Sequence, residues 1–428
     1  MTKQFKIIKP VAKVVARIRL PGSKSITHRA LMMGALSNGP WEIANPLRAE
    51  DTLLTAEAIK ALGTRLEWSE DRVRLTPPAR RWQGVSGTVF LGNSGTSARL
   101  LLALFSAGTG RFVMDGSARL RERPVGPAVT ALRKLGAQIS WREKEGFLPV
   151  EINSRGLSGG DVFVDASQSS QFLSGILIAA PAAAGIVRVQ WSERVASRPY
   201  LDMTIGMMKE AGISFEREGP NCILIPGPQA YAPCDFTVEG DCSSASYFWG
   251  AAALTGGEVF TSPVSSSSLQ GDCRFLQVLE KMGCRIFWEK DGVRVRGPQK
   301  LSPIEVDMNE MPDMVPTLAV LCAFAEGVSR IENVAHLRIK ESDRLYTVAA
   351  GLKMLGVEAR ELPDGLIVHG GAVAARPGGP VCAFNDHRIA MAFALAGLRL
   401  EGVVIEGAEA VSKSFPGFWE IFESLGAQ

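Results

Sequence analysis

Cations stand beside small hydroxyl and amide residues at the starts of several segments that we expect to be helices. Three such starts lie at residues 22–29, 93–99 and 385–388. A helix N-terminus has free N–H groups and a partial positive charge, so a cation there is unfavourable unless an anion compensates it. For one Arg or Lys, a solvated charge or a structural ion pair is the simpler interpretation. Because the pattern recurs, we predict a site for a ligand with several phosphate or carboxylate groups.

Two acidic residues, Asp313 and Glu341, fall among these cations. A carboxylate kept charged by neighbouring Arg and Lys can accept a proton from a substrate hydroxyl. Taken alone, each acid would more simply pair with a basic neighbour. The Gly22–Ser25 segment lacks the spacing of a Walker A loop, so ATP is not implied. The candidate chemistry is proton transfer beside bound anions.

Bulk composition excludes several classes of protein. The chain has 428 residues, which suggests two large domains, and its net charge of only +3 gives no general field for nucleic acid. No signal-peptide core is visible, and the most apolar run, residues 172–187, is too short to span a membrane. Seven cysteines without C-x-x-C pairs predict reduced thiols, with neither a disulfide nor a zinc site. We expect a cytoplasmic, monomeric α/β protein without metal.

A sixfold repeat organises the elements that position these residues. Six helix-like segments end in glycines that follow one another at intervals of 70 to 76 residues: Gly63, Gly136, Gly212, Gly283, Gly356 and Gly426. Glycine fits the left-handed position that ends a helix. A second series of segments, apolar nearly all round and therefore predicted to be buried helices, interleaves at the same period. We predict two similar domains, each of three α/β units with buried helices inside and sheets with amphipathic helices outside.

The sequence resembles the family of 5-enolpyruvylshikimate-3-phosphate synthases from about residue 20 to residue 417. The motifs that carry the resemblance are LPGSKSITHRA, LGNSGTSAR, RERPVG, SQSSQFLSG, SRPYLDMT, VEGDCSSASYF, LQGDCRF, RIKESDRL, NDHRIAM and SKSFPGF. The resemblance implies an inside-out barrel of the enolpyruvyl transferase type. Its domains would comprise residues 21–238 and residues 1–20 plus 239–428, hinged near 20–21 and 238–239, with the active site in the cleft between them.

The resemblance also implies the reaction and its residues. The enolpyruvyl group of phosphoenolpyruvate would pass to the 5-hydroxyl of shikimate 3-phosphate, on the route to chorismate and aromatic amino acids, without a cofactor. Asp313 would be the base, and Glu341 with Lys24 would handle protons at the methylene carbon. Phosphoenolpyruvate would be bound by Lys24, Asn93, Gly95, Thr96, Arg123, Gln171, Arg344, Arg388 and Lys413. Shikimate 3-phosphate would be bound by Lys24, Ser25, Arg29, Ser169, Ser170, Gln171, Ser197, Tyr200, Asp313 and Lys340.

Two positions depart from the family pattern. His336 stands where a shikimate-binding Asn is often found, so it is left out of the predicted site. Leu100 follows Arg99 where many members carry Pro. Gly95 would leave room for the inhibitor glyphosate to bind, whereas Leu100 argues for weaker binding of that inhibitor. The sequence therefore leaves sensitivity to glyphosate open.

Two other functions compete with this interpretation. The sister enolpyruvyl transferase that uses UDP-N-acetylglucosamine is similar in its double fold, but it relies on a loop cysteine and on a Lys-Asn motif that is Lys24-Ser25 here. A repeat protein that binds an anionic metabolite without turnover is the second alternative. Asp313 and Glu341 among the cations argue against the binding protein.

Overall fold

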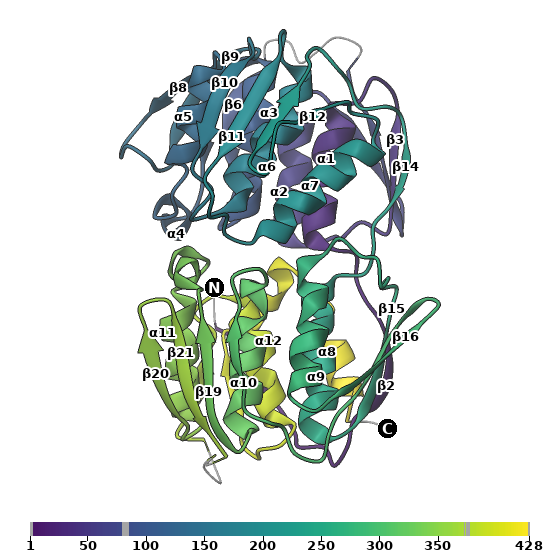
Figure 1. The fold of residues 1–428 in the computed structure, drawn as a ribbon, viewed down its shortest axis with the longest axis vertical. Coiled ribbons are helices and arrows are strands. Elements are labelled where there is room, and N and C mark those ends of the chain that lie inside the picture. Colours follow the sequence, from purple (N-terminus) through teal and green to yellow (C-terminus); the bar gives the residue numbers. More distant parts are fainter. Residues whose placement is uncertain (1–2, 79–84, 372, 374–376, 427–428) are drawn as a thin grey trace. The chain divides into compact units, whose positions relative to one another are not determined.

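The computed structural model describes residues 3–78, 85–371, 373 and 377–426. The chain forms two compact units, Lys24–Val238 and Met1–Ser23 with Glu239–Gln428. Both units are mixtures of helices and small sheets, as the sequence predicted (Figure 1). The hinge and the cleft between the domains stay predictions.

The unit Lys24–Val238 contains three four-stranded sheets, in the orders β14-β3-β5-β4, β6-β7-β9-β8 and β10-β11-β13-β12. Their strands are β3 (Trp41–Ala44), β4 (Arg65–Trp68), β5 (Arg72–Thr76), β6 (Val85–Phe90), β7 (Thr109–Asp115), β8 (Gln138–Trp141), β9 (Val150–Arg155), β10 (Gly160–Val164), β11 (Val187–Trp191), β12 (Glu216–Arg217), β13 (Cys222–Ile225) and β14 (Asp235–Thr237). The helices are α1 (Lys24–Ala35), α2 (Glu50–Ala61), α3 (Gly95–Ala107), α4 (Ala118–Arg121), α5 (Gly126–Lys134), α6 (Ser170–Ala179), η1 (Ala180–Ala182) and α7 (Arg198–Glu210).

The other unit has the sheets β16-β17-β15-β2, β18-β19-β21-β20 and the three-stranded β1-β23-β22. Their strands are β1 (Phe5–Ile7), β2 (Val15–Arg19), β15 (Glu258–Ser262), β16 (Arg285–Glu289), β17 (Gly292–Arg296), β18 (Glu305–Asp307), β19 (Gly327–Glu332), β20 (Glu358–Leu362), β21 (Gly365–Gly370), β22 (Val381–Cys382) and β23 (Val404–Glu406). The helices are α8 (Cys242–Thr255), η2 (Gly271–Arg274), α9 (Phe275–Lys281), η3 (Pro312–Met314), α10 (Val315–Phe324), η4 (Ala335–Ile339), α11 (Arg344–Met354), α12 (His387–Gly397), η5 (Ala408–Lys413) and α13 (Phe418–Ser424).

The predicted buried helices are α1, α3 and α6 in one unit and α8, α10 and α12 in the other. Nearly every residue of these six helices is buried, and within each unit they pack against one another (Figure 1). Close packing at α3 and α6 depends on Gly175, where an added Cβ would lie 2.9 Å from the Arg99 carbonyl oxygen. Helices that are apolar all round are stable only inside a core, so the first residues of each are held rigidly at the core's edge.

Five of the six helix-ending glycines have the predicted left-handed backbone, whereas Gly426, after α13, does not. Gly63, Gly136, Gly212, Gly283 and Gly356 have φ between 74° and 105°, directly after helices α2, α5, α7, α9 and α11. A side chain would be strained at such angles. The repeat seen in the sequence is therefore a repeat of supersecondary structure.

The expectation of seven reduced cysteines is wrong for one pair. Cys242, the first residue of α8, and Cys273 in η2 form a disulfide across 31 residues of sequence. No C-x-x-C motif marks this pair, because it is the fold that brings η2 against the start of α8. Cys222, Cys234, Cys284, Cys322 and Cys382 are free thiols.

A helix that spans a bilayer needs about 20 consecutive, mostly apolar residues. Across the described ranges, no helix combines the length and apolar character needed to cross a membrane.

Candidate active site

At the start of α3, in the unit Lys24–Val238, the Arg123 guanidinium and the backbone of Asn93–Gly95 form a cradle. Ser94 caps the helix by accepting from the Ser97 N–H, and Gly95 is its first residue. Arg123 is 3% exposed and donates from Nη1 to the Asn93 carbonyl oxygen at 3.1 Å. A Cβ on Gly95 would lie only 2.8 Å from Arg123 Nη1 and closer still to Nη2. The predicted residues Asn93, Gly95 and Arg123 therefore lie together, and the guanidinium occupies the space that a side chain at position 95 would need.

Gln171 connects α6 to the same helix start. Its Nε2 donates to Thr96 Oγ1 at 2.9 Å, and its Oε1 accepts from Arg99 Nη1 at 3.0 Å. Ser169 caps α6 by accepting from the Gln171 N–H at 3.3 Å, and Ser170 is the first residue of the helix. These bonds fix the Gln171 amide between a hydroxyl and a guanidinium.

Lys24, the first residue of α1, pairs with a carboxylate that sequence reasoning missed. Its Nζ lies 3.2 Å from Asp51 Oδ2, and the Asp51 side chain is 1% exposed. The positive charge of Lys24, which the sequence analysis expected a ligand anion to compensate, is thus partly compensated by Asp51. The signal for Asp51 was its place in the first turn of α2, beside Glu50.

Arg29 is anchored deep in the unit by neutral oxygens. It donates to Thr204 Oγ1 at 2.7 Å, Ser174 Oγ at 3.2 Å, and the carbonyl oxygens of Ser25 and Tyr200 at 2.9 and 3.0 Å. Burial lowers the pKa of Arg29 to about 10. The structure thus joins the predicted residues Ser25, Arg29 and Tyr200.

Ser197, the N-cap of α7, has φ 57° and ψ 51°. Left-handed angles are costly for a residue with a side chain and are concentrated at functional sites. Its carbonyl oxygen accepts from the Tyr200 N–H at 3.1 Å. Ser197 is therefore held in place beside Tyr200.

Asp313 lies between two guanidinium groups in the other unit. Arg344 Nη1 donates to its Oδ1 at 2.7 Å, and Arg388 Nη2 donates to its Oδ2 at 2.8 Å. Burial alone would raise the pKa of Asp313, but Arg388, Lys340 and Arg344 outweigh it and hold the pKa well below its usual range. Asp313 is thus a charged carboxylate among cations, as predicted.

Arg344 also contacts two further carboxylates. Its Nη2 donates to Glu341 Oε2 at 2.9 Å, and its Nε donates to Asp386 Oδ2 at 2.8 Å. Asp386 is fully buried and caps α12 by accepting from the Arg388 N–H at 3.0 Å. Burial would lower the pKa of Arg344, but Asp386 and then Glu341 raise it above its ordinary value. Sequence reasoning missed Asp386, although it stands in the NDHR motif at a helix start.

The remaining predicted residues of this unit lie at the ends of short helices. Lys340 follows η4 and Lys413 ends η5, where it is 5% exposed. His336 is also buried, and burial followed by the charge of Lys340 lowers its pKa to about 3. His336 is therefore a neutral imidazole whose surroundings include Lys340, Asp313 and Arg344.

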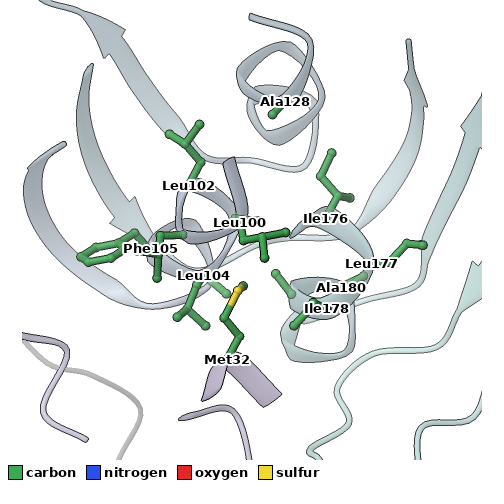
Figure 2. Close-up of a cluster of buried hydrophobic side chains, with 14 of the residues drawn as sticks. Met32, Leu100, Leu102, Leu104, Phe105, Ala128, Ile176, Leu177, Ile178 and Ala180 are labelled. Carbon is green, nitrogen blue, oxygen red and sulfur yellow. The ribbon is translucent and has the colours of Figure 1, made fainter. Parts of the chain in front are cut away.

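Leu100 does not belong to the polar group at the start of α3. Its side chain is 1% exposed, and Figure 2 shows it in the apolar cluster between α3 and α6. Any effect of Leu100 on the cradle must pass through the packing of these two helices.

Each unit thus contains one cluster of predicted site residues: Lys24, Arg29 and Arg123 belong to the first, and Arg344, Arg388 and Asp313 belong to the second. Together the clusters define a class of protein, an α/β fold of repeated units in which Arg and Lys are held at helix starts with a charged carboxylate among them. The fold is shared with the enolpyruvyl transferase NikO from Streptomyces tendae, at 18% identity and a TM-score of 0.79 over 99% of this chain and 97% of that one.

Closer relatives define the family. The EPSP synthase (3-phosphoshikimate 1-carboxyvinyltransferase) family model matches residues 8–422. A 3-phosphoshikimate 1-carboxyvinyltransferase of Syntrophobacter fumaroxidans is 58% identical over 98% of this chain and 99% of its own. An EPSP synthase structure from Acinetobacter baumannii is 31% identical with a TM-score of 0.81, covering 99% of this chain and 98% of that one. The chain belongs to the EPSP synthase family, and it is a transferase.

Proposed function

We propose that this protein transfers the enolpyruvyl group of phosphoenolpyruvate to the 5-hydroxyl of shikimate 3-phosphate and releases phosphate. It would work as a monomer in the cytoplasm, in the pathway to chorismate. The observation that carries the proposal is Asp313, a carboxylate held between Arg344 and Arg388. Family membership supports the choice of substrates.

The proposed first step joins the two substrates. The 5-hydroxyl oxygen bonds to C2 of phosphoenolpyruvate while its proton passes to Asp313, and a proton from Glu341 or Lys24 converts the methylene carbon to a methyl group. The product is a tetrahedral ketal phosphate. Guanidinium groups already in position would stabilise the developing charge without reorganisation.

The proposed second step breaks the bond between C2 and the phosphate oxygen. The methyl carbon returns a proton to Glu341 or Lys24, and the enol ether and inorganic phosphate leave. Arg123, Arg344, Arg388 and Lys413 would neutralise the phosphate and carboxylate of phosphoenolpyruvate, while Arg29, Ser169, Ser170, Ser197, Tyr200 and Lys340 would bind shikimate 3-phosphate. Thr96 and Gln171, joined at 2.9 Å, would orient the first substrate.

Phosphate release tests the proposal. Purified protein is given phosphoenolpyruvate alone, with shikimate 3-phosphate, or with UDP-N-acetylglucosamine. Release only with shikimate 3-phosphate is the expected result. Release only with the sugar nucleotide would assign the sister activity, and no release with either acceptor would favour a protein that binds anions without turnover.

A further inference from the structure

Asp272 is a further buried carboxylate, which lies close to Asp313 and Arg388 but is absent from the proposed mechanism. It belongs to η2 and is 3% exposed. Its Oδ2 accepts a hydrogen bond from Ser243 Oγ, on the second residue of α8. A buried charge is costly unless it is paired or hydrogen-bonded, so a carboxylate at this position requires a reason.

Ser243 connects Asp272 to the guanidinium of Arg388. Arg388 Nη2 lies 3.3 Å from Ser243 Oγ, and the same nitrogen lies 2.8 Å from Asp313 Oδ2. A serine hydroxyl has one proton to donate and lone pairs that accept. When Ser243 donates to Asp272, its lone pairs therefore face Arg388. Hydrogen bonds then connect Asp272, Ser243, Arg388 and Asp313 in that order.

The groups that shift the pKa of Asp272 include the other three members of this hydrogen-bonded series. Burial, then the charge of Asp313, raises the pKa of Asp272 to about 6, while Arg388 and the Ser243 hydroxyl oppose that shift. Asp241, the N-cap of α8, is the other acid that acts on it. Arg388 and Ser243 thus both favour the charged form of Asp272.

The two elements that carry Asp272 and Ser243 are fastened together. Cys242 and Cys273 form a disulfide on the residues next to them, and the Cys242 N–H donates to Gln270 Oε1 at 3.1 Å. When a ligand anion competes with Asp313 for Arg388, the bond to Ser243 can therefore persist. A fixed second anchor limits the positions that the guanidinium can take.

We propose that Asp272, acting through Ser243, is a positioning residue that holds the Arg388 guanidinium where it can bind the anionic substrate and release Asp313. This inference rests on the proposed function, which assigns Arg388 to phosphoenolpyruvate and Asp313 to the attacking hydroxyl. Neither Asp272 nor Ser243 is required to touch a substrate.

Four variants of the full chain test the inference: Ser243→Ala, Ser243→Thr, Asp272→Asn and Ser246→Ala. Ser246 is the matched control, a buried serine on α8 that bonds to the Ser243 carbonyl oxygen and lies 3.3 Å from Thr317 Oγ1. The KM for phosphoenolpyruvate and kcat are measured at saturating shikimate 3-phosphate from pH 5 to 9. Phosphoenolpyruvate binding is measured by calorimetry, and folding by thermal melts.

We expect Ser243→Ala and Asp272→Asn to raise the KM for phosphoenolpyruvate about tenfold, as for a lost hydrogen bond to a charged group. Ser243→Thr, which keeps the hydroxyl, should stay near wild type, and so should Ser246→Ala. The fall in kcat/KM below about pH 6 should be weaker in Asp272→Asn than in wild type. None of the four variants should melt well below wild type.

The inference is wrong if Ser243→Ala and Asp272→Asn match Ser246→Ala in KM and in pH profile. It is also wrong if Ser243→Thr is impaired as much as Ser243→Ala, because a hydroxyl would then not be the requirement. A wild-type protein without phosphate release contradicts the proposed function instead. In that case the calorimetric affinities of the variants for phosphoenolpyruvate decide the inference, with weaker binding expected in Ser243→Ala and Asp272→Asn.

Discussion

Arg388 and Asp313 form an ion pair of 2.8 Å, on residues 75 positions apart in the chain. Because Arg344 takes the other carboxylate oxygen, Asp313 is a weak base while both guanidiniums remain on it. An anion that draws either guanidinium away would raise the basicity of the carboxylate. In the proposed mechanism, this ion pair would couple binding of an anionic substrate to removal of a proton from the other substrate.

The first prediction concerns Asp313 itself. Asp313→Asn keeps the size of the side chain but cannot accept the proton, so kcat should fall about 10²- to 10⁴-fold. Binding of shikimate 3-phosphate, measured by calorimetry, should remain detectable. Asp307→Asn, in the exposed strand β18, is the control and should keep full activity. Near-normal turnover in Asp313→Asn would show that another group is the base.

The second prediction uses the contact between Gly95 and Arg123. In Gly95→Ala the new Cβ would clash with both terminal nitrogens of the guanidinium, which must therefore move. The KM for phosphoenolpyruvate should rise roughly tenfold, the loss of about one hydrogen bond to a charged group. Inhibition by glyphosate, followed as a curve at fixed phosphoenolpyruvate, should weaken as well.

Gly87→Ala is the control for this substitution, because a Cβ at Gly87 meets no heavy atom within 4 Å. The Gly87→Ala substitution replaces a glycine in strand β6 and makes no contact with Arg123. If Gly95→Ala and Gly87→Ala have the same KM and the same inhibition curve, the cradle at α3 does not hold the anion.

The third prediction concerns the partner of Lys24. Asp51→Asn removes the carboxylate 3.2 Å from Lys24 Nζ, and with it a favourable charge in the first turn of α2. Lys24 would then lose its alignment, and kcat/KM for phosphoenolpyruvate should fall about tenfold. Urea unfolding should show a loss of about 1 kcal/mol or more. The neighbouring exposed acid supplies the control, Glu50→Gln, which should change the kinetics by less than about twofold.

The sequence predicted the helices of this fold better than it predicted the strand pairing. Buried helices such as α3 and α10 are apolar on all sides, and helix-ending glycines such as Gly136 need angles that few other residues adopt. Both signals are local. The pairing of β2 with β15 and of β14 with β3 joins residues 243 and 193 positions apart in the chain, and no local pattern encodes such a partner.

The candidate site was predicted in part for the same reason. Motifs and helix starts identified Asp313, Arg344 and Arg388, which the structure brings together. The carboxylates Asp51 and Asp272 were missed because a single acid in a polar segment resembles any helix cap or surface charge. Only the fold shows that each is buried beside a particular cation or hydroxyl.

The fourth prediction follows from the raised pKa of Asp272. In the unfolded chain this carboxyl loses its proton near pH 3.8, whereas the folded protein retains it until about pH 6. The contribution of Asp272 to the free energy of unfolding is therefore fully present below pH 3.8. It should fall by roughly 3 kcal/mol as the pH rises from there to about 6. Asp272→Asn has no proton to lose there. Its free energy of unfolding relative to wild type should rise between about pH 4 and 6 and then stay level.

Chemical denaturation across that range measures the difference, with Asp307→Asn as the reference variant. Parallel curves for wild type and Asp272→Asn would mean that Asp272 ionises alike in the folded and unfolded chain, and its charge would then have no special cost beside Asp313 and Arg388.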